Sequence, residues 1–328
     1  MITQEYILGM GRKFIESRIV FSAAELDVFT ILSKDSMSAQ EIANELNVSL
    51  RGITILLNAL VAMGLLEKKY ERFSCPTEAA SLLSKDSPTS IMPMLMHSAA
   101  LWRRWSALTD IVRQNTDVSR PSAPEYKEWD QEAFIGAMHV IASQMAPSIV
   151  AAIKPGAAKK LIDIGGASGT YTQAFLEACP DMRATLFDLP PVIEMARRRL
   201  SGTGLIGRIT LVAGDFYTDE LPAGHDLAFL SAIIHQNSTE QNLTLYRKIY
   251  RSLEPGGRLV IRDHIMSRDR TKPVSGALFA VNMLVVTQGG CTYTFEEIHE
   301  ALKAAGFINI HLIQQDERMN GLVEGFRP

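Results

Sequence analysis

The segment LIDIGGASGTYTQAF, residues 161–175, decides the fold of this 328-residue chain. It consists of an apolar run that contains Asp163, a glycine-rich turn and the start of a helix. Because glycine has no Cβ, such a turn brings bare backbone against a flat polar ligand. The glycines of this turn are Gly165, Gly166 and Gly169. The dinucleotide pattern G-x-G-x-x-G is not met, since Ala167 and Thr170 hold its third and sixth places, and NAD is disfavoured.

The pattern around this segment predicts the fold class. From residue 157 onward, strands alternate with helices, which is typical of an α/β protein with a doubly wound parallel sheet and ligands at the carboxyl ends of its strands. We expect strands at 160–164, 183–187, 209–213, 227–231, 258–262, 308–313 and 321–326. The short connection QQDERMN between the last two predicts an antiparallel hairpin.

The N-terminal part has a different pattern, mainly helical, and resembles a winged helix-turn-helix. Ser38 and Glu41 fit a capping box, and Ser49 can cap a second helix. The stretch GLLEKKYERFSCPT follows as a hairpin-like pair of strands. The second helix offers only Arg51 and Asn58 among apolar residues, so subunit pairing is favoured over DNA binding. We expect a dimerisation domain at 1–115, connecting helices at 116–156 and a ligand-binding domain at 157–328.

Composition restricts the partners. A net charge of −3 and a pI of about 6.2 give no cationic surface for nucleic acid or anionic lipid. Three separated cysteines form no C-x-x-C pair, and no His, Asp or Glu cluster has metal-ligand spacing. The N-terminus lacks the order of a signal peptide, and no apolar run approaches the ~20 residues that span a bilayer. We expect a cytoplasmic protein with small-molecule or protein partners.

Polar residues follow the strands that come after the glycine turn. Asp188 ends the second strand, where a carboxylate can accept hydrogen bonds from both ribose hydroxyls of an adenosine ligand. After the third strand, Asp215 can accept from the adenine amino group while Phe216 covers the ring. The predicted cofactor site also includes Leu189, Gly214 and Ser231. Three successive strand ends thus predict a site for an adenosine-type cofactor.

These motifs together resemble a known family, the S-adenosylmethionine-dependent small-molecule O-methyltransferases. This class includes plant caffeate and flavonoid enzymes, acetylserotonin methyltransferase and antibiotic-tailoring enzymes. The resemblance runs nearly end to end, through FDLP at 187–190, GDF at 214–216, LEPGGRLVIRD at 253–263 and NMLVVTQGG at 282–290. It implies a Rossmann-like seven-stranded sheet, an N-terminal winged-helix dimerisation domain, a homodimer, and S-adenosylmethionine as cofactor with S-adenosylhomocysteine as product.

The resemblance also implies a mechanism. His235 occupies the place of the family's histidine base, and Asp263 matches the acid that orients it. Imidazole is suited to this task because its neutral form accepts a proton near neutral pH. Met283 and Thr287 fall on positions that line the acceptor pocket. From the residues themselves we add Trp102, in the Met- and Trp-rich stretch 91–112, and His139 as candidate pocket residues.

Some residues depart from the family pattern and leave alternatives open. Gln236 and Asn237 replace the usual Asp and Trp after the histidine, and Thr292 replaces a glutamate of the plant members. Loss of that second carboxylate leaves the base less firmly oriented. The alternatives are N- or C-methylation, or the use of a bound cofactor for decarboxylation, hydroxylation or ring formation. A DNA-binding regulator is a further alternative.

Overall fold

The computed structural model describes residues 1–114 and 128–328. Within these residues, the strand and helix alternation builds a seven-stranded sheet of order β11-β12-β8-β7-β4-β5-β6. Its strands are β4 (Lys160–Ile164), β5 (Arg183–Asp188), β6 (Ile209–Ala213), β7 (His225–Ser231), β8 (Leu253–Asp263), β11 (Ile308–Gln314) and β12 (Gly321–Phe326). Strands β4 to β8 run parallel, while β12 is antiparallel to β8 and β11. The predicted strands and the final hairpin are confirmed.

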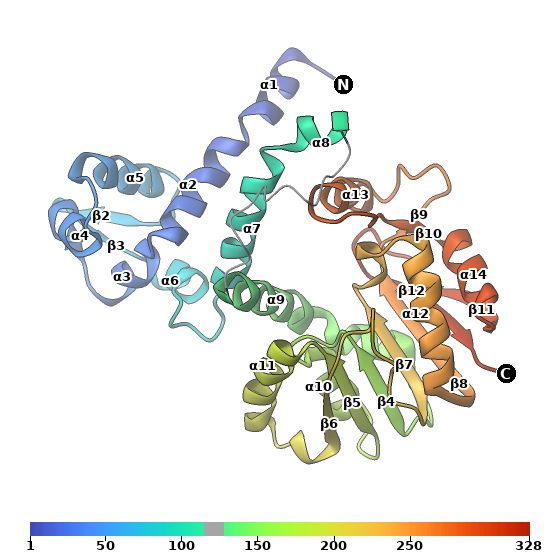
Figure 1. Ribbon diagram of the computed structural model, residues 1–328. Coiled ribbons are helices and arrows are strands. Elements are labelled where there is room, and N and C mark those ends of the chain that lie inside the picture. The colour runs from blue at the N-terminus through green and yellow to red at the C-terminus, as the bar shows by residue number, and fades with distance from the viewer. Residues whose placement is uncertain (115–127) are drawn as a thin grey trace. The chain divides into compact units, whose positions relative to one another are not determined.

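Helices cover both faces of this sheet, as the doubly wound pattern predicts (Figure 1). One face carries α12 (Thr239–Ser252) and α14 (Phe295–Ala304), and the other carries α10 (Thr170–Ala178), α11 (Pro190–Leu200) and the end of α9 (Glu128–Ile153). Along β8, Ile261 packs toward α12 and α14, whereas Val260 packs toward α9 and α10. The same alternation directs Asp263 to the first face and Arg262 to the second.

Shorter elements complete this part of the chain. Helix α13 (Val274–Val286) follows β9 (Ile265–Met266), which pairs in parallel with β10 (Tyr293–Thr294). Helix α8 (Leu108–Gln114) contacts α13. The described residues also form the 3-10 turns η1 (Ser201–Thr203), η2 (Ile206–Arg208) and η3 (Ile234–Gln236). The last of these follows β7 and carries the histidine predicted to be the base.

The N-terminal part forms a second compact unit, made of Met1–Arg103 and a segment that ends at Val140. Its helices are α1 (Gln4–Arg12), α2 (Phe14–Glu25), α3 (Val28–Lys34), α4 (Ala39–Leu46), α5 (Leu50–Ala62), α6 (Thr77–Leu83) and α7 (Met92–Trp105). Its sheet has the order β1-β3-β2, from β1 (Met37–Ser38), β3 (Arg72–Ser74) and β2 (Glu67–Lys69). The capping box of Ser38 and Glu41 is present, and the hydroxyl of Ser49 caps α5.

Helix α9 corrects one expectation. The stretch Ile135–Ile153 has 19 residues with a mean hydropathy of 1.4, long and apolar enough to cross a membrane by length and composition. The sequence pattern had predicted no apolar run of this length. The apolar composition is explained by packing against the sheet. Four residues of this stretch are buried in the core beside the sheet: Ala146, Ile149, Val150 and Ile153.

Candidate active site

The glycine turn after β4 leaves the backbone open, as the sequence predicts. Gly165 has a φ of +67°, and a Cβ there would lie 2.5 Å from Cδ1 of Ile233 and 3.8 Å from the ring of Phe216. Gly169, with a φ of +75°, is the N-cap of α10. A side chain at these glycine positions is disfavoured both by the positive φ and by the contacts that its Cβ would make. The loops after β4 and β6 therefore approach each other closely.

Two acids flank the turn, one buried and one half-buried. Asp163 is 2% exposed, and its Oδ2 accepts a hydrogen bond of 2.6 Å from the Thr172 hydroxyl. Burial raises the pKa of Asp163 to about 6. At the end of β5, Asp188 accepts from the backbone N–H of Ala167 at 2.8 Å and of Leu189 at 2.7 Å, and burial raises its pKa as well. Both oxygens of Asp188 keep a lone pair for a ligand's hydroxyl groups.

The loop after β6 carries Asp215 and Phe216 and is fixed by hydrogen bonds, including three from a lysine on α12. Oδ1 of Asp215 accepts from the backbone N–H of Tyr217 at 2.8 Å. The ammonium of Lys248 on α12 donates to the carbonyl oxygens of Phe216, Tyr217 and Asp219 at 2.9, 3.1 and 2.8 Å. Lys248 was missed from the sequence, because a lysine on an amphipathic helix usually points into solvent. It fixes the loop that presents the predicted adenine contacts.

The structure brings the two predicted catalytic residues together. Nδ1 of His235 lies 2.9 Å from each carboxylate oxygen of Asp263, which also accepts from the backbone N–H of His264 at 2.7 Å. His235 is 8% exposed and Asp263 is 1% exposed. Since an ionised carboxylate only accepts hydrogen bonds, Nδ1 carries the proton and Nε2 is the nitrogen with a lone pair. The contact with Asp263 therefore fixes the orientation of the His235 ring.

One residue that departs from the family pattern, Asn237, belongs to a hydrogen-bond network next to the turn that carries His235. Asn237 is fully buried; its Oδ1 accepts from the Tyr217 hydroxyl at 2.5 Å, and its Nδ2 donates to Asn242 at 3.0 Å. Asn242 in turn donates to the carbonyl of Ile234 at 2.9 Å, and the Tyr293 hydroxyl donates to the carbonyl of Asn237. This amide network connects the turn that carries His235 with the loop that carries Phe216.

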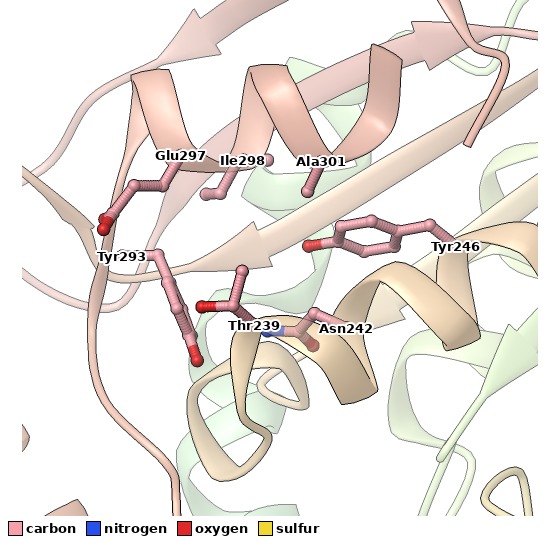
Figure 2. A pocket seen from close by; sticks show the side chains of 7 residues that line it. All are labelled: Thr239, Asn242, Tyr246, Tyr293, Glu297, Ile298 and Ala301. Carbon is pink, nitrogen blue, oxygen red and sulfur yellow. The ribbon is translucent and has the colours of Figure 1, made fainter. Parts of the chain in front are cut away.

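A small pocket lies beside this network, between α12 and α14 (Figure 2). Its lining residues are Thr239, Asn242, Tyr246, Tyr293, Glu297, Ile298 and Ala301. Its volume of about 10 Å³ is close to the space needed by one water molecule. The pocket is therefore far too small for an organic acceptor.

Helix α13 places apolar side chains near His235. The ring of Phe279, which the sequence analysis did not single out, lies 4.8 Å from the His235 ring and 5.1 Å from the His264 ring, between centroids. Met283 is buried on the same helix. The Thr287 hydroxyl donates to the carbonyl of Met283 at 2.7 Å and accepts from the Gly290 N–H at 2.9 Å, so it ends α13. Periodicity from the predicted Met283 could have found Phe279, four residues earlier.

The remaining predicted residues have separate environments. Ser231 ends β7, Gly214 follows β6, and Thr292 is buried beside β10. Trp102 and His139 belong to the N-terminal unit, where the Trp102 ring contacts Phe14 and Phe21. Their part in an acceptor pocket stays a prediction. In the described ranges 1–114 and 128–328, no group of three His, Cys, Asp or Glu residues could hold a metal ion.

Comparison with known proteins decides the family. An O-methyltransferase domain model matches residues 105–308, and an O-methyltransferase dimerisation domain model matches residues 9–86. The chain belongs to this O-methyltransferase family. The methyltransferase is 30% identical to acetylserotonin O-methyltransferase of Gallus gallus, over 94% of this chain and 93% of the relative. It is 28% identical to 3-hydroxy-5-methyl-1-naphthoate 3-O-methyltransferase of Streptomyces sahachiroi, over 95% and 92%.

A solved structure agrees with this assignment. Human N-acetylserotonin methyltransferase, solved in complex with S-adenosylmethionine, superposes with a TM-score of 0.84 at 25% identity, over 99% of this chain and 98% of that one. The cofactor of the methyltransferase is S-adenosylmethionine. Its own residues fit this group, because the open backbone at Gly165 and the lone pairs of Asp188 lie at neighbouring strand ends.

Proposed function

We propose that this methyltransferase transfers a methyl group to a hydroxyl of an aromatic or polyketide-like small molecule, with His235 as general base and Asp263 as its orienting partner. The observation that carries the proposal is the buried contact of 2.9 Å between Nδ1 of His235 and Asp263, at the end of the strands that follow the cofactor loops. Asp163, Gly165, Gly166, Gly169, Asp188, Leu189, Gly214, Asp215, Phe216 and Ser231 form the cofactor site in this proposal.

The cofactor and the residues of the chain have separate roles in the proposed reaction. S-adenosylmethionine supplies a methyl group already activated by its sulfonium. Nε2 of His235 accepts the proton of the acceptor hydroxyl, and the Asp263 carboxylate stabilises the imidazolium that forms. The backbone N–H of His264 keeps that carboxylate in place. Because the His235–Asp263 pair receives the proton, no metal ion is needed to activate the oxygen.

The acceptor is assigned as an aromatic compound on two grounds. Phe279 and Met283 give the region near His235 an apolar and aromatic surface. A relative that acts on a hydroxynaphthoate aligns along nearly the whole chain. We include Met283, Thr287, Trp102 and His139 in the proposed acceptor site.

We further propose that the protein acts as a cytoplasmic homodimer without nucleic-acid partners. The dimerisation domain match supports pairing, and several large apolar side chains of α1 and α2 are exposed: Tyr6, Ile7, Leu8, Met10, Phe14 and Ile15. Light scattering after size exclusion should give twice the chain mass. A monomer at micromolar concentration would contradict the dimer.

The activity is tested by incubating the protein with methyl-labelled S-adenosylmethionine and a panel of phenols, quinols and polyketides. We expect label in a product whose mass has increased by one methylene unit, and nuclear magnetic resonance should place the new methyl on oxygen. A methyl on nitrogen or carbon would replace the O-methylation assignment. A converted acceptor without label would favour decarboxylation, hydroxylation or ring formation instead.

A further inference from the structure

A buried cation lies next to the cofactor loops and takes no part in the proposed mechanism. Arg262 on β8 is 4% exposed. Its guanidinium donates to Oδ1 of Asn320 at 2.9 and 3.3 Å, to the Ser231 hydroxyl oxygen at 3.2 Å and to the sulfur of Met145 at 2.9 Å. None of these acceptors is a carboxylate, although a buried charge normally requires a counter-charge.

The surroundings of Arg262 agree with this lack of a paired carboxylate. Burial lowers the pKa of Arg262, and the opposing effects of Tyr171, Asp263 and Asp316 do not cancel the shift. The alternation along β8 turns Asp263 toward the other face of the sheet, where it pairs with His235. An anion beside the guanidinium would remove the deficit.

A second observation points to a ligand at the same place. The guanidinium carbon of Arg262 lies 5.3 Å from the ring centre of Tyr171, on α10 directly after the glycine turn. Tyr171 is 7% exposed, and its buried hydroxyl has no partner in good hydrogen-bond geometry among the described residues, although the Ser231 side chain is close enough to lower its pKa. A buried hydroxyl in this state costs free energy unless a ligand receives its hydrogen bond.

Ser231 connects these groups to the space where the cofactor binds. It ends β7, which is hydrogen-bonded to β4 on one side and to β8 on the other, and it is only partly buried. Its oxygen accepts from Arg262, which leaves the hydroxyl hydrogen available for a ligand. Arginine, serine and tyrosine donors are thus gathered at the carboxyl ends of β7 and β8, beside the glycine turn after β4.

We infer that Arg262, with Ser231 and Tyr171, binds the carboxylate at the amino-acid end of S-adenosylmethionine. This inference rests on the cofactor site of the proposed function. It assigns to the amino-acid end of the cofactor Arg262 on β8, a residue to which the sequence patterns gave no role. Arginine is suited to the task because its donors match a carboxylate. Asn320 and Met145 orient the guanidinium from the side away from Ser231.

The test compares two ligands that differ by one group. Isothermal titration calorimetry is performed with S-adenosylhomocysteine and with S-adenosyl-3-thiopropylamine, the same molecule without its carboxylate. In the wild-type protein we expect the carboxylate to improve affinity about 10- to 100-fold, as for hydrogen bonds to a charged group. In Arg262→Gln this ratio should fall close to one.

Three further variants keep the test decisive. Tyr171→Phe should reduce the ratio several-fold while the melting temperature of the ligand-free protein stays equal or rises, which loss of a structural contact would not produce. Ser231→Ala should also reduce the ratio. If Arg262→Gln does not fold, Tyr171→Phe and Ser231→Ala test the assignment in its place. Asp188→Asn is the matched control, because it should weaken both ligands equally and leave the ratio unchanged.

The possible failures are distinguishable. If the wild-type protein binds neither ligand, the cofactor site of the proposed function is wrong. If it binds both ligands and folded Arg262→Gln keeps the wild-type ratio, the carboxylate assignment is overturned. A change confined to the KM of a carboxylated acceptor would overturn it as well and would assign the arginine to the acceptor.

Discussion

The two ends of the sheet edge that carries the proposed site differ in the partners of their carboxylates. At β4, β5 and β6, Asp163, Asp188 and Asp215 receive hydrogen bonds from a hydroxyl and from backbone N–H groups, and none of these partners is a cation. At β7 and β8, the carboxylate of Asp263 meets the imidazole of His235, which becomes a cation when it accepts a proton. The carboxylates at β4 to β6 therefore have no cationic partner in the described part of the chain, whereas the carboxylate of Asp263 gains one when His235 accepts a proton.

This difference fits the two tasks. A sulfonium cofactor with an ammonium group is positively charged, so unpaired carboxylates at β4 to β6 are suited to receive it. Proton transfer needs the opposite arrangement, a base whose charged form is stabilised inside the protein. The following predictions test whether the two ends are separable.

The largest effect on the cofactor end is expected for Asp188→Ala. The substitution removes both carboxylate oxygens offered to the ribose hydroxyls, so affinity for S-adenosylhomocysteine should fall about 100-fold. Calorimetry measures this loss. Asp181→Ala is the matched control, because Asp181 precedes the same strand and pairs with Lys159 on the surface. An equal loss in both variants would remove the special role of Asp188.

Asp163 predicts a pH-dependent stability. Its pKa is raised from 3.8 to about 6 in the folded state. The folded protein therefore holds a proton that the unfolded chain has released between these values, and this contribution to stability, present below about pH 4, is lost as pH rises through 6. Relative to Asp163→Asn, the wild-type free energy of unfolding should decrease by about 2 kcal/mol between pH 4 and pH 7.

Urea unfolding of both proteins across this pH range measures the difference, because groups common to the two proteins cancel. A difference in unfolding free energy that does not change with pH would mean that folding does not raise the pKa of Asp163. An opposite slope would mean that the folded state favours the ionised carboxylate.

At the proton-transfer end, Asp263→Asn should lower kcat about 10- to 100-fold without changing cofactor affinity. The amide is neutral and stabilises the imidazolium less than the carboxylate does. Single-turnover kinetics with saturating cofactor measures the effect. A loss of cofactor affinity of similar size would show that the two ends are not independent.

The connection between the ends is tested by Tyr217→Phe, with the smallest expected effect on turnover. It leaves the buried Oδ1 of Asn237 without its donor, which should cost about 1–3 kcal/mol of stability and reduce kcat a few-fold. Thermal unfolding and steady-state rates are the measurements. Tyr70→Phe, at a fully exposed tyrosine, is the control and should change neither. Wild-type stability in Tyr217→Phe would contradict the role of the network.

The same contrast explains what the sequence could predict. The cofactor end depends on glycines and acids within a few residues of a strand end, so the stretch around Gly165 and the acids Asp188 and Asp215 are recognisable from local pattern. The strands were predictable for a similar reason, since β4 and β6 are short, mainly apolar runs next to charged residues.

The supporting contacts were not predictable, because they join distant segments. Tyr217 and Asn237 are 20 residues apart, and Lys248 reaches Phe216 across 32 residues. Asn237 is recognisable from the sequence only as a departure from the family pattern. Its buried hydrogen bonds, which connect the turn that carries His235 with α12, depend on residues that the pattern does not bring together.

The most direct test of the whole account is one variant measured in two ways. His235→Ala should reduce methyl transfer to a phenol acceptor by about 100-fold or more, because the proton acceptor is lost. The same protein should bind S-adenosylhomocysteine with wild-type affinity, because the cofactor end is intact. Retained turnover, or a parallel loss of cofactor binding, would contradict the division of the sheet edge into a cofactor end and a proton-transfer end.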